Sequence, residues 1–373
     1  IIPVNIILLI YLITFGVSKL SIITLFMDKF EKIKLGISIG DFNGIGIEII
    51  LKTFSDKRML DFCTPIIFGS TRLITAYKKN IDNNVPFNGI KHMDQVIHGK
   101  INILSLWKDD IELKLGEPTK MSGEFAFKSL EAATKAIANG EIDVLVTAPI
   151  NKDNIQSDDF KFPGHTEYLE SKLEGESLMI LMTDKLRIGL ITGHIPVSKV
   201  SETITPELIK RKVNILYDTL VQDFAISKPK IAILGLNPHC GDHGVIGNED
   251  DEIIRPAIAE IQEEGKLVYG PYAADSFFGS ENYKNFDAIL AMYHDQGLAP
   301  FKTLSFGEGV NFTAGLNKVR TSPDHGTAYE LAGKGIANIN SFKEAVFMAI
   351  KIFRTRSEYK SLTENTLKTD RRK

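Results

Sequence analysis

Three histidines in this chain of 373 residues each follow a short apolar run that is typical of a strand buried on both faces. The runs and their histidines are 187–192 with His194, 230–236 with His239, and 287–293 with His294. Because parallel strands end along one edge of a sheet, these imidazoles can converge there. Three neutral imidazoles with one open position are the ligand set of a catalytic divalent-metal site, whereas the alternative is three unrelated histidines, each satisfied by its own hydrogen bond.

Charged and amide groups lie near these histidines in the sequence. Asp242, Asp275 and Asp295 are carboxylates that can orient imidazole ligands, and Lys302, Asp275 and Asp295 are the candidate catalytic residues. Downstream of His294 come Lys302, Asn311 and Arg320, which together can hold an anionic substrate. The competing interpretation of the two basic residues is surface ion pairing.

Two glycine-containing turns are predicted to open helices and therefore to favour anions through free backbone amides. The first places His165 and Thr166 at the start of a helix that runs to about residue 173. The second places His325, Gly326 and Thr327 before a predicted helix over residues 328–333. A third glycine-rich turn, over residues 40–48, lacks the GxGxxG spacing of a dinucleotide fingerprint and is not assigned a phosphate.

Strand and helix patterns alternate along the chain, which predicts a parallel α/β sheet. Predicted strands cover residues 34–39, 65–69, 101–107 and 142–147, and Ser122 is the predicted N-cap of a helix that ends at Asn139. With 43% hydrophobic residues, 24% charged residues and a net charge of -3, the composition suits a globular protein of two domains. It argues against a nucleic-acid binder that relies on a broad basic face.

The cysteines and the N-terminus bear on location. Cys63 and Cys240 are far apart and fit no metal or redox spacing, which favours packing roles in a reducing, cytoplasmic compartment. Residues 1–26 are apolar with one charge, Lys19, so they are either an anchor or signal segment, or an extension foreign to the fold that precedes a true start at Met27. We favour the second interpretation and expect no membrane association.

Five motifs make the sequence similar to a known family. They are PGHTE at 163–167, TGHIP at 192–196, LNPH at 236–239, AMYHDQGL at 291–298 and RTSPDHGTA at 320–328. In these motifs the chain resembles the 4-hydroxythreonine-4-phosphate dehydrogenases of vitamin B6 biosynthesis, the PdxA-like proteins, over about residues 34–353. One departure is visible at residues 40–48, where Phe42 and Ile47 replace two prolines of the usual GDPAGIGPE-like run.

The resemblance implies a fold of two α/β/α sandwich domains like that of isocitrate and isopropylmalate dehydrogenases. The expected division is a cofactor-binding domain over residues 28–148 plus 305–373 and a metal- and dimer-forming domain over 149–304. It further implies a homodimer with the active site at the interface, and one divalent ion (Zn²⁺, Mg²⁺ or Co²⁺) on His194, His239 and His294. The implied substrate contacts are His165, Thr166, Lys302, Asn311 and Arg320. NAD or NADP would bind along residues 324–338, at His325, Gly326, Thr327, Gly333 and Asn338.

The implied reaction oxidises the C3 hydroxyl of 4-phosphooxy-L-threonine, and the resulting β-keto acid decarboxylates to 3-amino-2-oxopropyl phosphate. A dehydrogenase of D-threonate or D-erythronate 4-phosphate would keep the same metal and phosphate groups and is the nearest alternative. A phosphate acyltransferase of related fold is a further alternative, although acyl transfer to phosphate has no need of three histidine ligands. A binding protein without catalytic activity is the third.

Overall fold

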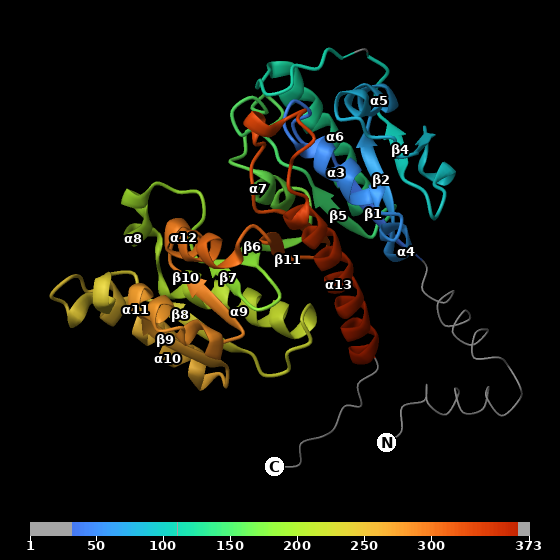
Figure 1. Cartoon of the computed structure of the whole chain (residues 1–373). Helices are drawn as coiled ribbons and strands as arrows, with labels where there is room; N and C mark the ends of the chain where they lie inside the picture. The colour runs from blue at the N-terminus through green and yellow to red at the C-terminus, as the bar shows by residue number, and fades with distance from the viewer. Residues whose placement is uncertain (1–31, 110, 365–373) are drawn as a thin grey trace, which may run out of the picture.

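The computed structural model describes residues 32–109 and 111–364, in which twelve strands form one sheet. The apolar extension 1–26 and Met27 lie outside the described residues. Figure 1 shows the strands and their helices gathered into two lobes, with β1, β2 and β5 in one and β7, β8 and β10 in the other. The α/β class predicted from the alternating pattern is confirmed.

One half of the sheet consists of six strands that run parallel to one another. In spatial order they are β3 (Asn88–Ile90), β4 (Asn102–Ser105), β2 (Cys63–Gly69), β1 (Ile33–Ser38), β5 (Val144–Thr147) and β12 (Val319–Pro323). The sheet continues through β11 (Val310–Leu316), β6 (Gly175–Met182), β7 (Arg187–Leu190), β10 (Ala288–Ala291), β8 (Lys230–Leu234) and β9 (Leu267–Tyr272). Strands β11 and β6 are antiparallel to both of their neighbours, while β7, β10, β8 and β9 are again parallel. The two halves therefore join through an antiparallel seam.

Helices cover both faces of each half. The α-helices are α3 (Gly46–Ser55), α4 (Met59–Phe62), α5 (Thr71–Asn80), α6 (Lys120–Ala138), α7 (His165–Glu170), α8 (Val200–Thr203), α9 (Pro206–Gln222), α10 (Arg255–Glu263), α11 (Ala274–Gly279), α12 (His294–Ser305) and α13 (Asn340–Thr363). Short turns of 3-10 or π geometry are η1 (Met93–Gln95), η2 (Val197–Lys199), η3 (Pro238–Asp242), η4 (Asp250–Ile254), η5 (Asn282–Asn285) and η6 (Tyr329–Leu331). None of the helices in the described part of the chain is long and apolar enough to cross a lipid bilayer.

Alternate residues of the strands enter cores on opposite faces. On β2, Ile67 joins the core beneath α3 and α13, while Ile66 and Phe68 join the core beneath α6. On β10, Leu290 packs with residues of α9 and α10, while Ile289 packs with residues of α11 and α12. This period of two is what makes each half a helix–sheet–helix sandwich.

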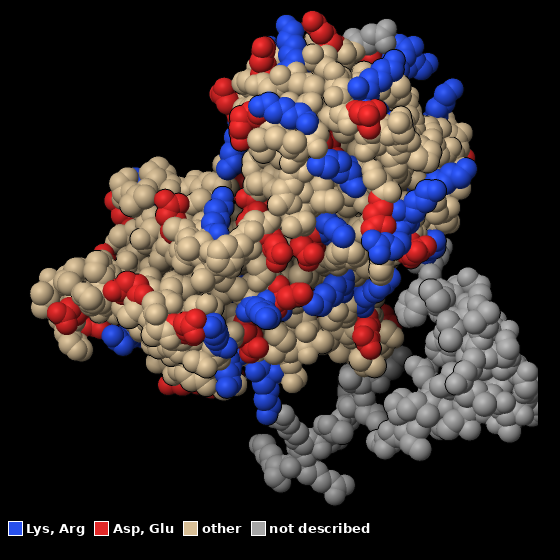
Figure 2. Space-filling model, in the orientation of Figure 1, with Lys and Arg blue, Asp and Glu red and all other residues tan. Residues whose placement is uncertain are grey.

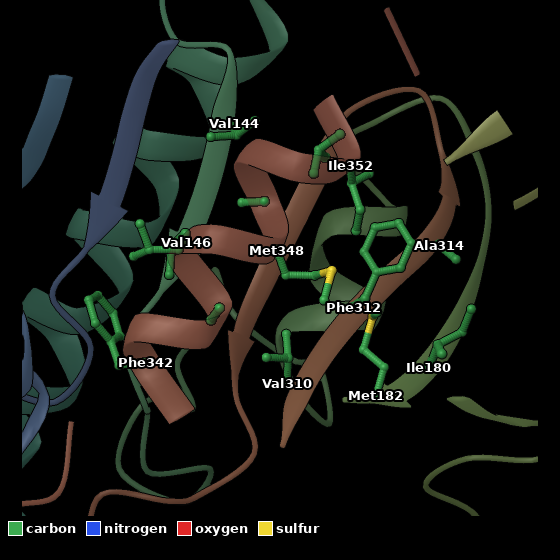
Figure 3. Close-up of a cluster of buried hydrophobic side chains, with 14 of the residues drawn as sticks. Val144, Val146, Ile180, Met182, Val310, Phe312, Ala314, Phe342, Met348 and Ile352 are labelled. Atoms are coloured by element: carbon green, nitrogen blue, oxygen red, sulfur yellow. The ribbon is translucent and has the colours of Figure 1, made fainter. Parts of the chain in front are cut away.

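Helix α13 lies across the seam between the two halves (Figure 3). Its Met348 points toward Phe312 and Val310 of β11, and Phe342 lies near Val146 of β5. Because strands from both halves bury side chains against the same helix, α13 ties the halves into one core.

Two predicted helix boundaries need correction. Helix α6 is capped by Thr119, which accepts a hydrogen bond from the Ser122 amide, so Ser122 is the third helical residue of a capping box and not the N-cap. The helix predicted over residues 328–333 is wrong, because only the three residues of η6 are helical. Ala328 has a φ of 43° and Gly333 a φ of 74°, and these left-handed residues interrupt any longer helix.

Replacing Phe312 with alanine should lower the free energy of unfolding by about 3–5 kcal/mol, because the ring is fully buried at the seam. The control is Phe306→Ala, whose ring is 87% exposed and which should change stability by less than about 0.5 kcal/mol. Urea unfolding followed by circular dichroism measures both. Similar losses for the two variants would show that β11 and α13 do not form a common core.

Candidate active site

A pocket of about 340 Å³ opens between the two halves of the sheet. Its walls come from the segment after β5, from α7, β6, β11 and α12, and from the segment after β12. The predicted site residues that line it are His165, Thr166, His194, His294, Lys302, Asn311, Arg320, His325 and Gly326. Residues from motifs far apart in the sequence thus share one cavity.

Arg320 is a buried cation in the pocket wall, with 1% of its surface exposed. Its guanidinium donates from Nε to Thr147 Oγ1 at 3.1 Å and from Nη1 to Thr313 Oγ1 at 3.0 Å. Both partners are neutral hydroxyls. Burial lowers the pKa of Arg320 to about 9, which still leaves the guanidinium charged at neutral pH. Among the described residues, no carboxylate lies within ion-pair distance of Arg320. A desolvated cation of this kind is well suited to binding an anionic ligand.

Four buried polar atoms of the pocket residues have no hydrogen-bond partner in the part of the chain that the structure describes. They are His165 Nε2, Glu167 Oε2, Asn311 Oδ1 and His325 Nε2. Unsatisfied buried polar groups are uncommon in native proteins, and their concentration around one cavity indicates that a polar ligand completes the hydrogen bonds. Burial, followed by the charges of Arg320 and Lys152, holds the pKa of His165 well below its ordinary value, so His165 is neutral at pH 7.

His194 is held between a carboxylate and an ammonium group. Its Nδ1 lies 3.0 Å from Glu167 Oε1, and Lys152 Nζ lies 3.2 Å from its Nε2. An imidazole that donates from Nδ1 and accepts at Nε2 satisfies both contacts. Burial favours the neutral form of Glu167, but the hydrogen bond from His194, a hydrogen bond from the backbone and the charge of Lys152 outweigh it. The pKa of Glu167 therefore lies below its usual range.

His294, the first residue of α12, lies beside His194 with the ring centroids 5.5 Å apart. Its Nδ1 contacts Asp295 Oδ1 at 2.7 Å. Each of the two imidazoles thus has a carboxylate on Nδ1 and keeps Nε2 on the other side. A carboxylate on the distal nitrogen is the common way in which proteins orient a histidine ligand for a metal.

His239 does not line this pocket, although β8 is the parallel neighbour of β10 as the strand pattern requires. It opens a run of five residues with positive φ, from His239 (54°) to His243 (53°). A left-handed turn of this kind redirects the chain directly after β8. Within residues 32–109 and 111–364, no three His, Cys, Asp or Glu side chains stand close enough together to hold a metal ion. A single chain therefore brings together two of the three predicted ligands.

The other predicted residues are distributed as follows. Asp295 is exposed on the outer side of His294, and Asp275 is exposed on α11, away from the pocket lining. Asp242 lies in the left-handed run. Thr327, Gly333 and Asn338 do not line the pocket, although they continue the segment that begins there at Ser322.

Lys152, Glu167 and Thr147 belong to the pocket but were not among the predicted site residues. A signal existed for each of them. Thr147 ends a predicted strand, Lys152 closes the polar turn that follows it, and Glu167 lies within the PGHTE motif next to two predicted ligands. The end of a buried strand is where polar residues reach a site in α/β proteins.

The residues present suit a divalent metal in their chemistry. His194 and His294 are imidazoles that each keep Nε2 away from an orienting carboxylate, and neutral imidazole is a ligand for Zn²⁺ and Co²⁺. Lys152 occupies the Nε2 side of His194, so a metal bound there would displace its ammonium group.

The family model of the pyridoxal phosphate biosynthetic protein PdxA matches residues 61–349. The chain belongs to the PdxA family. It is 50% identical over 340 residues to a 4-hydroxythreonine-4-phosphate dehydrogenase of Bacteroides thetaiotaomicron, covering 91% of this chain and 93% of the relative. It is 36% identical to a D-threonate 4-phosphate dehydrogenase of Cupriavidus necator, covering 84% and 95%. Membership in the PdxA family, predicted from the five motifs, is confirmed.

A solved structure of a PdxA-family protein shows the same fold. The crystal structure of 4-hydroxythreonine-4-phosphate dehydrogenase from Klebsiella pneumoniae superposes with a TM-score of 0.72 at 30% identity, covering 87% of this chain and 98% of that one. The match covers 87% of this chain, so the fold is shared over most of its length.

Replacing His165 with asparagine should flatten the pH dependence of stability. Its folded pKa lies below the ordinary 6.5, so below that pH the unfolded chain takes up a proton that the folded chain does not. Stability is therefore lost as the pH falls through 6.5, by about 1.4 kcal/mol at about pH 5.5 from this residue. Urea midpoints at about pH 7.5 and 5.5 measure the effect, with exposed His92→Asn as control. Parallel pH curves for wild type and His165→Asn would contradict the assignment.

Proposed function

We propose that this protein is a 4-hydroxythreonine-4-phosphate dehydrogenase that supplies pyridoxal phosphate biosynthesis. The observation that carries the proposal is the buried Arg320 guanidinium, paired only with hydroxyls, in a pocket that also contains the His194–His294 pair. A phosphorylated hydroxy acid offers an anion for the first feature and an oxidisable hydroxyl for the second. The relative that is 50% identical carries the same name.

The substrate 4-phosphooxy-L-threonine has a phosphate at one end and a carboxylate at the other. Arg320 and Lys302 provide two cations for these groups, and Arg320 can bind two oxygens of one anion at once. His165, Thr166 and Asn311 provide neutral hydrogen-bonding groups on the facing walls. The unpartnered atoms His165 Nε2 and Asn311 Oδ1 gain partners when the substrate enters.

In the reaction, the C3 hydroxyl loses its proton and C3 loses hydride to the nicotinamide. Lys302, Asp275 and Asp295 are the proposed proton-transferring residues, of which Lys302 lines the pocket in this chain. The product 2-amino-3-oxo-4-phosphooxybutanoate is a β-keto acid and loses CO₂ to give 3-amino-2-oxopropyl phosphate. A divalent ion on the histidines would stabilise the alkoxide and the enolate as a Lewis acid. Arg320 keeps the phosphorylated product in place by the same contacts that bind the substrate.

NAD or NADP is proposed to bind along residues 324–338. His325 and Gly326 enter the pocket, and Thr327, Gly333 and Asn338 follow outside it, which suits a cofactor that reaches the substrate with one end only. No GxGxxG turn is required for this mode. Two free, buried cysteines accord with the proposed cytoplasmic location.

The active site is proposed to be completed by a second copy of the chain. His239 is separate from the pair His194 and His294, and exposed apolar side chains flank both groups. Val197 is 78% exposed and lines a cavity shared with the pair, and Val245 is 80% exposed close to His239 in the sequence. Apolar surface of this kind is covered in symmetric dimers. One copy would then supply His194 and His294, and the other His239.

A single assay tests the reaction. Purified protein is supplied with 4-phosphooxy-L-threonine, D-threonate 4-phosphate or D-erythronate 4-phosphate, each with NAD⁺ and NADP⁺, and the absorbance of the reduced cofactor is followed. We expect kcat/KM for 4-phosphooxy-L-threonine to exceed the other two by at least about tenfold. The relative at 36% identity that acts on D-threonate 4-phosphate defines the competing outcome, in which that substrate leads.

Mixed dimers test the shared site. His194→Ala and His239→Ala chains should each be inactive alone, because each lacks one metal ligand. When the two are unfolded and refolded together, about one quarter of wild-type activity should return, because half of randomly formed dimers are mixed and each holds one intact site. Refolded mixtures of His194→Ala with His294→Ala are the matched control and should stay inactive. Recovery in neither mixture would place all three ligands in one chain.

A further inference from the structure

Asp41 is a buried carboxylate, with none of its surface exposed, at the turn after β1. Its Oδ2 accepts hydrogen bonds from Ser122 Oγ at 2.8 Å, Asn154 Nδ2 at 2.7 Å and Tyr329 Oη at 2.9 Å. Its Oδ1 accepts from the Asn43 amide at 2.9 Å. All four donors are neutral groups, so oriented dipoles stabilise the carboxylate.

The donors belong to segments that are far apart in the sequence. Ser122 lies in the first turn of α6, Asn154 follows the pocket wall that ends at Lys152, and Tyr329 follows the pocket wall that ends at Gly326. Asp41 therefore joins the two walls through one oxygen atom. Burying a charge is unfavourable, and removing this carboxylate would leave three donors unpaired. We therefore infer that Asp41 serves to hold these segments in fixed positions.

The turn that carries Asp41 also contacts the second wall through its backbone. The Ile45 amide donates to the Thr327 carbonyl at 3.0 Å, and a Cβ at Gly44 would lie 2.6 Å from the same oxygen. Farther along, the Ala337 amide donates to Glu48 Oε1 at 2.8 Å, and Lys52 Nζ donates to the Ala337 carbonyl at 2.8 Å. Residues 327–337 thus lie along the turn 40–48 and the start of α3.

Tyr329 is the side chain through which this anchoring reaches Asp41. Burial and the neighbouring charge of Asp41 raise the pKa of Tyr329, so the phenol remains a donor at all ordinary pH values. Ala328, with its φ of 43°, and the single helical turn η6 leave the segment little internal hydrogen bonding. The position of this segment therefore depends on its contacts with the turn 40–48 and with α3.

We propose that Asp41 is a positioning residue for the nicotinamide cofactor, which holds residues 324–338 against the pocket through Tyr329. This inference rests on the proposed function, in which that segment binds the cofactor. Phe42 and Ile47 replace the family's prolines within this turn, and both are fully buried. Asp41 still accepts its four hydrogen bonds, and Gly44 still allows the turn to approach the Thr327 carbonyl.

The test uses Tyr329→Phe, which removes one hydrogen bond to Asp41 and keeps the ring. The affinity for NAD⁺ or NADP⁺, measured by calorimetry, should fall about tenfold, as expected for a lost hydrogen bond to a charged acceptor. The KM for the phosphorylated substrate should stay within about twofold, because Arg320 and Lys302 are untouched. Hydrogen exchange of residues 324–335 in the free protein should become faster.

The matched control is Ser122→Ala, which removes a different hydrogen bond to the same oxygen of Asp41. It should lower the melting temperature without changing cofactor affinity or the exchange of residues 324–335 by more than about twofold. Equal effects of the two variants, or no effect of Tyr329→Phe on cofactor affinity and exchange, would overturn the inference. A wild-type protein that binds neither cofactor would overturn the proposed function as well.

Discussion

The buried guanidinium of Arg320 is the feature on which the arrangement of the site depends. Strand β12 carries it and lies between β5 and β11, so the hydroxyls of Thr147 and Thr313 on those neighbours are its partners. Moving a cation out of water is unfavourable unless it is well hydrogen-bonded, and neutral hydroxyls repay only part of that cost. Under the proposed function, the anionic substrate would recover the rest, at the seam where the two halves meet.

The remaining charges of the pocket follow from that cation. His165 stays neutral because burial and two neighbouring cations oppose its protonation, so it adds no second buried charge to the pocket wall. Glu167 stays ionised because His194 and Lys152 offset its burial. On the face shown in Figure 2, acidic and basic side chains are interspersed without a continuous basic patch, which fits a protein whose anion site is local.

The sequence predicts the parts of the fold in which apolar pattern and burial coincide. Strands β1, β2, β5, β7, β8 and β10 stand out as apolar runs, and the strands that precede the three histidines are indeed parallel neighbours. Strands β11 and β12 were not predicted, because they contain Asn311, Thr313 and Arg320 and so look polar. The inward-facing residues of these strands belong to the site. Because those residues are polar, the strands lack the alternation of apolar and polar residues by which a strand is predicted. The helix predicted after Thr327 fails for a related reason, since Ala328 adopts a left-handed conformation that no pattern of residue types reveals.

The position of His239 is a second feature that the residue pattern does not predict, and it explains why a single chain brings together two of the three predicted metal ligands. Five consecutive residues with positive φ are unfavourable by roughly 1 kcal/mol or more for each one that is not glycine. Buried Asp250 offsets this strain, since its two oxygens accept from the amides of Leu236 and Asn237 and fix the chain directly before the turn. A strained turn that is held this firmly fixes the position of His239, which stands outside the pocket that contains His194 and His294. Strand order alone predicts three ligands at one edge, but the backbone after β8 leaves His239 outside the pocket of the other two. In the proposed dimer, His239 of each chain would complete the active site of its partner.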